Sequence, residues 1–111
     1  MVFEHVTTFD ELWEGDMDSF QVAEQEILVV HLEGGEVVAT QAICPHQQFE
    51  LVEGELKGTS LTCRAHLWQF DLTTCKGINP GHAELARFPV RVDGDDIYVD
   101  PAGDVPRFAH S

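Results

Sequence analysis

The sequence has no Lys or Arg before residue 57, although thirteen Asp and Glu residues lie in that stretch. Over the whole chain, 20 acidic and 6 basic residues give a formal net charge of −14. Such a surface repels phosphate backbones and anionic headgroups, which excludes nucleic acids and membrane surfaces as partners. The charge either keeps the chain in solution or steers it toward a basic protein partner, and composition alone does not choose between these.

Cysteine and long apolar runs are also scarce. Three cysteines among 111 residues make no disulfide framework. The longest strongly apolar run is ILVV at residues 27–30, far short of the roughly 20 residues that span a bilayer. The first twelve residues contain no basic stretch and no long apolar segment, so we expect no signal peptide. These features predict a cytoplasmic protein with reduced thiols.

The chain pattern is mostly that of β structure. Hairpins are predicted for residues 27–42, which have two glycines at the turn, for residues 55–63, which turn at Gly58, and for residues 88–100, which alternate around an Asp-Gly turn. Four prolines between residues 80 and 106 exclude long helices from the second half. The length allows one domain, residues 1–111. We expect an all-β antiparallel sandwich or barrel, least regular between residues 44 and 80.

One segment, TTFDELWEG at residues 7–15, predicts a helix. Thr8 is a candidate N-cap, Glu11 three residues later would complete a capping box, and Gly15 would end the helix. We expect this helix to serve packing only.

Two short motifs carry the chemistry. CPH places Cys44 and His46 two residues apart, and CRAH places Cys63 and His66 three apart, with 16 residues between His46 and Cys63. Two facing loops could thus present two thiolates and two imidazoles to one site. Zinc accepts such a set, but zinc motifs usually pair Cys with Cys and His with His. Mixed pairs favour a [2Fe–2S] cluster with both cysteines on one iron and both histidines on the other. A structural zinc module is the alternative.

The spacing C-x-H, then 16 residues, then C-x₂-H resembles the Rieske pattern at all four ligand positions. The resemblance implies a Rieske fold, with an antiparallel β base and a loop-built cluster-binding subdomain at about residues 43–81. It also implies one cluster per chain, bound by Cys44, His46, Cys63 and His66. Neutral imidazoles leave the oxidised cluster uncharged, so adding an electron costs less than in an all-cysteine cluster and the reduction potential is higher.

The residues around the ligands predict a potential in the lower part of the Rieske range, which runs from roughly −150 to +300 mV. Respiratory Rieske proteins of high potential join the two loops by a disulfide and place Gly-Ser after the second histidine. The equivalent positions here are Phe49 and Ala65 for the disulfide and Leu67-Trp68 for the Gly-Ser pair. Without the serine hydroxyl, a hydrogen bond to sulfur that favours the reduced cluster is missing, so the potential is expected to be lower.

The resemblance is closest to the ferredoxin component of bacterial toluene monooxygenases. It extends over nearly the whole chain and includes CPHQ, TCRAHLW, GINP, GDDIYV and the terminal AHS. It implies a monomeric carrier that takes single electrons from an NADH-dependent flavin reductase and delivers them, in transient complexes, to a diiron hydroxylase of aromatic rings. The alternative is the ferredoxin of an aromatic ring-hydroxylating dioxygenase. The chain has no second iron motif and no nucleotide-binding loop, so we do not expect an enzyme.

Partners are expected to dock where the two histidines approach the surface. There we predict a mostly apolar rim with acidic side chains at larger radius, a surface suited to transient contact. Residues 76–81, KGINPG, are expected to cover the cluster, and the large indole next to a ligand would exclude water. The rim and shielding residues are Pro45, Gln47, Leu67, Trp68 and Pro80.

The remaining cysteine and histidines are not expected to bind the metal. Cys75 has no histidine at either motif offset and is predicted to be a spare thiol. The other histidines are expected to be surface or hydrogen-bonded side chains; they are His5, His31, His82 and His110.

Overall fold

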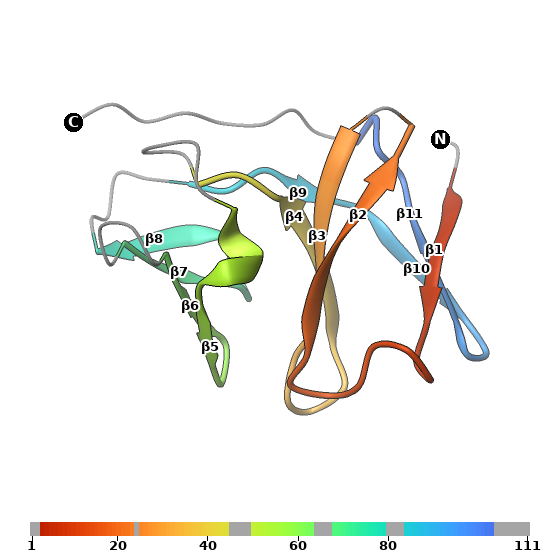
Figure 1. Ribbon diagram of the computed structural model, residues 1–111, viewed down its shortest axis with the longest axis horizontal. Coiled ribbons are helices and arrows are strands. Elements are labelled where there is room, and N and C mark those ends of the chain that lie inside the picture. Colours follow the sequence, from red (N-terminus) through yellow and green to blue (C-terminus); the bar gives the residue numbers. More distant parts are fainter. Residues whose placement is uncertain (1–2, 24, 45–49, 64–67, 80–83, 104–111) are drawn as a thin grey trace.

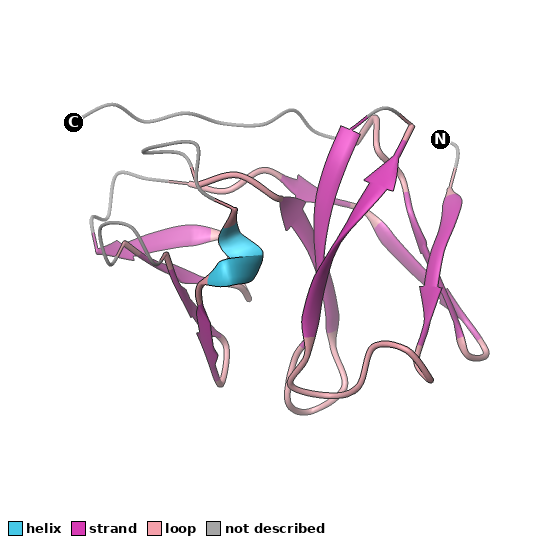
Figure 2. Cartoon of the chain, viewed as in Figure 1, coloured by secondary structure: helices cyan, strands magenta, loops and turns pink. Residues whose placement is uncertain are grey.

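The computed structural model describes residues 3–23, 25–44, 50–63, 68–79 and 84–103. This part of the chain is almost entirely β structure, with one short 3₁₀ turn (Figure 2). In chain order the elements are β1 (Glu4–Thr8), β2 (Met17–Val22), β3 (Gln25–His31), β4 (Val37–Gln41), η1 (Leu51–Glu53), β5 (Glu55–Lys57), β6 (Ser60–Thr62), β7 (Gln69–Asp71), β8 (Lys76–Asn79), β9 (Arg87–Phe88), β10 (Val90–Asp93) and β11 (Asp96–Val99).

The strands form three antiparallel sheets, so the predicted all-β class is confirmed. The central sheet has the order β2-β3-β4-β9, and the outer sheets have the orders β1-β11-β10 and β5-β6-β7-β8. Figure 1 shows the β5–β8 sheet on the left, the β2–β4 strands in the middle and the β1, β10 and β11 strands on the right. Among the described residues, no helix is long and apolar enough to cross a membrane.

The run ILVV is uniformly apolar because β3 has both faces covered. Successive side chains of a strand point to opposite faces. Ile27 and Val29 pack in one core cluster with the β11 residues, while Leu28 and Val30 pack in a second cluster with η1, β6 and β7. All four side chains are fully buried, and burial of such a side chain stabilises the fold by about 1.5–3 kcal/mol.

The three predicted hairpins are confirmed. β3 and β4 pair from Ile27↔Gln41 to His31↔Val37, and their turn uses Gly34 at φ 101° and Gly35 at φ 97°, where a Cβ would be strained. β5 pairs with β6 and β10 pairs with β11 across turns that contain Gly58 and Gly94. The sequence pattern does not indicate β1, β2, β7 or β8.

The predicted helix at residues 7–15 is wrong. Thr8, the candidate N-cap, is instead the last residue of β1 and pairs with Asp96. A single turn follows, in which the Leu12 N–H donates to the Thr8 carbonyl oxygen at 3.0 Å. The Gly15 N–H then donates to the His31 carbonyl oxygen at 2.7 Å, which returns the chain to the central sheet. Strand pairing and this anchor therefore override the local helix signal.

The β5–β8 sheet is an insertion between two neighbouring strands of the central sheet. β4 and β9 pair directly, with Ala39 opposite Phe88 and Thr40 opposite Arg87, although more than forty positions separate them along the chain. The chain therefore leaves the central sheet after β4, builds the β5–β8 sheet with η1, and returns beside its point of departure (Figure 1).

Candidate metal centre

The first predicted loop leaves from the end of β4 and is closed at its base by backbone pairing. Ile43 forms an antiparallel bridge with Glu50, and the Leu51 N–H donates to the Ala42 carbonyl oxygen at 2.8 Å. Cys44, the first residue beyond the bridge, is only 2% exposed. His46, together with Pro45 and Gln47, lies outside the described residues.

The second predicted loop is closed in the same way at the end of β6. The Cys63 N–H donates to the Trp68 carbonyl oxygen at 2.7 Å, so the two residues that flank positions 64–67 are bonded to each other. Cys63 is 1% exposed. His66 and Leu67 lie outside the described residues, as does Pro80 of the predicted covering segment.

Cys44 and Cys63 belong to the same buried core cluster, and neither forms a disulfide. An apolar interior raises the cost of a thiolate unless a positive partner is bound to it. Each of these two buried cysteines lies at the start of a loop, and a backbone hydrogen bond closes each loop at its base. Such cysteines are suited to be the two thiolate ligands of an iron–sulfur cluster. The two histidine ligands stay a prediction.

Cys75 occupies the same core cluster in a different role. It has a left-handed backbone at φ 60°, its Sγ lies 3.9 Å from the Leu72 carbonyl oxygen, and its own carbonyl oxygen accepts the Leu85 N–H at 2.8 Å. Among the described residues, no three His, Cys, Asp or Glu side chains are grouped so as to hold a metal ion. That Cys75 is not a metal ligand stays a prediction.

The two described histidines among those predicted not to be ligands have other partners. The His5 Nε2 lies 3.0 Å from an Asp96 carboxylate oxygen, and the His31 Nδ1 lies 3.0 Å from the Leu12 carbonyl oxygen. His82 and His110 lie outside the described residues.

Trp68 is buried, with 8% of its surface exposed, and its ring centre lies 6.5 Å from that of Phe70. This burial suits the predicted shielding role better than a place on an exposed rim. Ile78 of β8 is 51% exposed. It belongs to the predicted covering segment but is not among the predicted rim residues. The alternation of polar and apolar residues in KGIN is too short to have revealed which face of β8 is covered.

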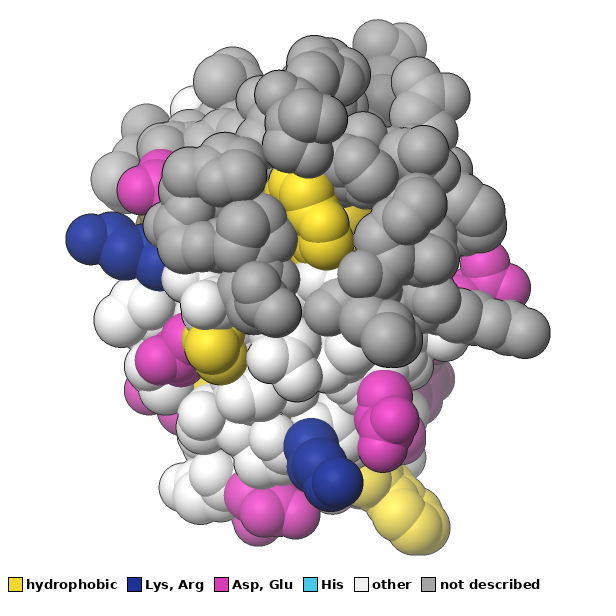
Figure 3. All heavy atoms as spheres, turned by 90° about the vertical axis from the view of Figure 1, so that its left-hand side faces the viewer, with side chains coloured by type: hydrophobic (Ala, Val, Ile, Leu, Met, Phe, Trp, Pro, Cys, Tyr) yellow, Lys and Arg dark blue, Asp and Glu magenta, His cyan; other side chains and the backbone are white. Residues whose placement is uncertain are grey.

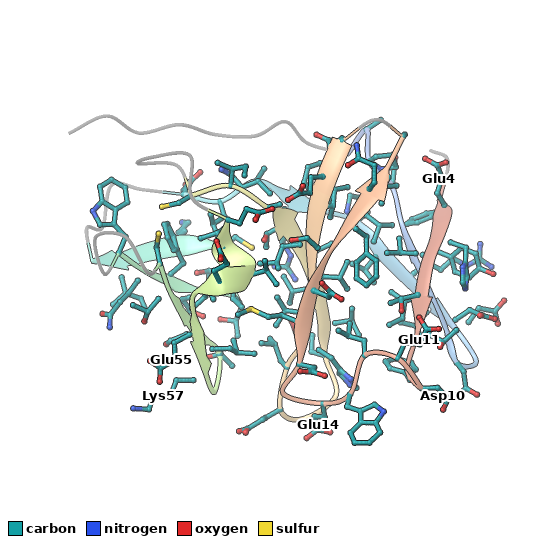
Figure 4. The ribbon with its side chains drawn as sticks, viewed as in Figure 1. Glu4, Asp10, Glu11, Glu14, Glu55 and Lys57 are labelled. Carbon is teal, nitrogen blue, oxygen red and sulfur yellow. The ribbon has the colours of Figure 1, made fainter. Side chains whose placement is uncertain are left out.

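Acidic side chains lie around the end of the molecule formed by the β5–β8 sheet. Figure 3 views this end and shows hydrophobic side chains near its middle, with Asp and Glu side chains mainly toward its edges. Figure 4 shows that Glu55 and Lys57 project from β5, whereas Glu4 lies on β1 and Asp10, Glu11 and Glu14 lie in the turns between β1 and β2. The acidic charge therefore extends over both the insertion and the base.

A carboxyl pair links β3 to the end of the first predicted loop. Burial raises the pKa of Glu26, and hydrogen bonding and repulsion with Glu50 raise it further. The Oε1 atom of Glu26 is buried and has no hydrogen-bond partner among the residues that the structure describes. The folded state disfavours the charged form of Glu26, and this is why its pKa is raised. The Glu26 carboxyl therefore favours folding at acidic pH, where it is protonated. That contribution is lost as the pH rises through the raised pKa.

We expect Glu26→Gln to stabilise the protein at neutral pH, because an amide can donate to the Glu50 carboxylate without adding charge. The advantage should disappear at a pH below the ordinary glutamate pKa, where the Glu26 carboxyl is protonated in the folded and the unfolded state. Chemical denaturation at several pH values measures the effect. Glu33→Gln, which removes the same charge from an exposed turn, is the control, and an equal gain in both variants would contradict the pairing.

Comparison with known proteins places these features in a family. The family described as Rieske [2Fe-2S] domain matches residues 3–89. The ferredoxin component of the alkene monooxygenase system of Xanthobacter autotrophicus is 44% identical over 95 residues, covering 85% of this chain and 77% of that protein. The ferredoxin component of biphenyl 2,3-dioxygenase of Rhodococcus jostii is 34% identical over 106 residues, covering 95% and 98%.

Solved structures agree. The ferredoxin of carbazole 1,9a-dioxygenase from Nocardioides aromaticivorans superimposes with a TM-score of 0.83 at 29% identity, covering 91% of this chain and 99% of that one. The relatives are named as ferredoxin components of oxygenase systems and not as the oxygenases, which argues against the zinc alternative and against an enzyme. The chain belongs to the family of Rieske [2Fe–2S] domains, and its cofactor is a Rieske-type [2Fe–2S] cluster.

Proposed function

We propose that the protein is a Rieske ferredoxin that carries single electrons from an NADH-dependent flavin reductase to the diiron hydroxylase of a toluene or related aromatic monooxygenase. The observation that carries the proposal is the likeness to oxygenase ferredoxins. It reaches 44% identity with a monooxygenase ferredoxin and 34% with a dioxygenase ferredoxin. The motifs that resemble the toluene monooxygenase family favour an aromatic substrate for the hydroxylase.

In this proposal Cys44 and Cys63 are the buried ligands, and His46 and His66 are the ligands nearest the partner. When bound, the cluster supplies a site that accepts and releases one electron at a potential set by its two imidazole ligands. The chain contributes two loops with fixed ends and a buried indole that keeps water from the thiolate side. The proposed path for the electron to the partner lies on the side of the two histidines. The cluster-binding subdomain is residues 43–81 of a domain that spans residues 1–111.

The acceptor can be tested directly. Reduced protein would be mixed with a diiron aromatic hydroxylase or with a ring-hydroxylating dioxygenase, and the rate of cluster reoxidation followed in each case. The proposal predicts faster reoxidation by the diiron hydroxylase. Faster transfer to the dioxygenase would support the alternative, a dioxygenase ferredoxin.

We further propose that both partners dock in turn on the predicted rim, now extended by Ile78. β8 carries this exposed side chain and forms the first four residues of the predicted covering segment, residues 76–81. An apolar centre that excludes water, with acidic side chains around it, suits a complex that forms quickly and separates quickly. The chain then works as a monomeric shuttle, and its compartment is proposed to be the cytoplasm, in keeping with three cysteines that form no disulfide.

Ile78→Lys is expected to slow electron transfer from the reductase and to the hydroxylase, by roughly tenfold each, because a charge would be buried in the contact. Leu67→Lys should do the same, and the cluster spectrum should be unchanged in both. Stopped-flow rates at several salt concentrations provide the measurement, and salt should slow both transfers by screening the charges.

The control is Val92→Lys, which changes a side chain of similar exposure, 47%, on β10 of the base. Equal effects of the Ile78 and Val92 substitutions, or rates that do not depend on salt, would contradict this docking surface.

A further inference from the structure

The insertion is joined to the central sheet at a narrow neck that the chain crosses twice. It leaves through residues 42–44, which follow β4, and returns through residues 84–86, which precede β9. Gln41, the last residue of β4, lies at this neck and is 1% exposed. A long amide side chain is seldom buried so completely unless its donors and acceptor are satisfied.

The Gln41 amide makes one hydrogen bond to each crossing. Its Nε2 donates to the Ile43 carbonyl oxygen at 2.8 Å on the outgoing side. Its Oε1 accepts the Ala86 N–H at 2.9 Å on the returning side. Its backbone N–H donates to the Ala86 carbonyl oxygen at 3.2 Å. One residue therefore holds both crossings in a fixed register.

Further hydrogen bonds extend this tie into the insertion. On the outgoing side, the Ala42 carbonyl oxygen accepts the N–H of Leu51 in η1 at 2.8 Å. On the returning side, the Leu85 N–H donates to the Cys75 carbonyl oxygen at 2.8 Å, just before β8. The tie at Gln41 thus connects the base of the first loop with the start of β8, the strand that begins the predicted covering segment.

The Ile43 carbonyl belongs to the same peptide unit as the Cys44 N–H. A hydrogen bond to that carbonyl therefore fixes the orientation of the peptide group from which Cys44 projects, and peptide planarity transmits the constraint to the cysteine. A buried carbonyl that loses its donor must find another by moving, since an unmade buried hydrogen bond is costly. Any such movement would begin one residue from the thiol ligand.

We propose that Gln41 is a positioning residue for the cluster: its side-chain amide ties the two crossings of the neck together and thereby sets the placement of Cys44. The proposal rests on the assignment of Cys44 as a ligand under the proposed function. Residues that orient a ligand affect a metal centre nearly as strongly as the ligands do.

The test compares Gln41→Leu, which keeps the approximate volume and removes the side-chain hydrogen bonds to Ile43 and Ala86, with Thr7→Val. Thr7 is also buried, at 3% exposure, but it lies on β1, and its hydroxyl donates to a Glu11 carboxylate oxygen at 3.4 Å and not to a backbone carbonyl at the neck. The readouts are the EPR signal of the reduced holoprotein, its reduction potential and the rate of iron loss to a chelator. Gln41→Leu should lose iron roughly tenfold faster and show a shifted EPR signal and potential, while Thr7→Val should match the wild type.

Gln41→Glu carries the test if Gln41→Leu does not fold. A protonated glutamic acid can donate to Ile43 and accept from Ala86, whereas the ionised form cannot donate. The rate of iron loss relative to wild type should therefore rise with pH for this variant. A pH-independent ratio, or a Gln41→Leu variant with the EPR signal and iron-loss rate of Thr7→Val, would overturn the proposal. A wild-type protein without a Rieske EPR signal would instead overturn the ligand assignment.

Discussion

Cys44→Ser and Cys63→Ser are each expected to abolish the Rieske spectrum, and so are His46→Ala and His66→Ala. Loss of a thiolate leaves an iron under-coordinated, and the two loops lose the crosslink that the cluster provides. Both cysteines lie in the same apolar core cluster, so a serine hydroxyl there would be a poor iron ligand and a poorly satisfied polar group. Optical and EPR spectra of the purified variants, with iron assays, provide the measurement.

Cys75→Ser is the matched control for these substitutions. Cys75 is as buried as the two predicted ligands, at 2% exposure, and its backbone is hydrogen-bonded to Asp71 and Leu85, in the turn before β8. This variant should retain the cluster and its potential, with at most a modest loss of stability. A protein that needs Cys75 for its spectrum and tolerates Cys63→Ser would show that the ligand assignment is wrong.

Gly54→Ala is expected to be the most damaging of the conservative substitutions outside the ligands. A Cβ on Gly54 would clash with the Thr62 carbonyl oxygen, which is a backbone atom that cannot rotate away. The next residue along the chain is Cys63, so the displaced strand carries a predicted ligand. Overpacking of this kind costs about 3 kcal/mol, and we expect both a lower unfolding midpoint and faster iron loss.

Gly58→Ala separates this steric effect from ordinary glycine strain. Gly58 has a left-handed backbone at φ 62°, but a Cβ there would meet nothing within 4 Å. Its cost should be limited to about 1 kcal/mol of backbone strain, and the cluster should be unaffected. A Gly54→Ala variant that is no more destabilised than Gly58→Ala would contradict the close packing of Gly54, at the end of η1, against the backbone of β6.

The sequence carried most of the fold because its signals were local. Hairpins with glycine at the turn and alternating strands depend on residues close in sequence, and those at Gly34, Gly58 and Gly94 were found. The predicted helix at residues 7–15 does not form, because Thr8 pairs with Asp96, a partner 88 positions away that no local pattern reveals. The short strands β7 and β8 likewise depend on tertiary pairing rather than on propensity.

The candidate site was predicted from spacing rather than from shape. The Cys and His offsets indicate a mixed ligand set, and the burial of Cys44 and Cys63 in one cluster agrees with it. Side-chain exposure was harder to predict. Trp68 is buried while Ile78 is exposed, because the cover over each depends on which strands pack against it. Gln41 gave no sequence signal, since a glutamine becomes informative only when both of its partners are placed.

The central claim is that this chain binds a [2Fe–2S] cluster through two cysteines and two histidines, and the most direct test is the EPR spectrum of the reduced purified protein with iron and acid-labile sulfide assayed on the same sample. We expect a coloured protein that contains iron and acid-labile sulfide in equal amounts. Its reduced spectrum should be of the Rieske type, with a lower average g value than an all-cysteine cluster gives. A colourless protein that contains zinc and no labile sulfide, or a spectrum typical of four cysteine ligands, would contradict it.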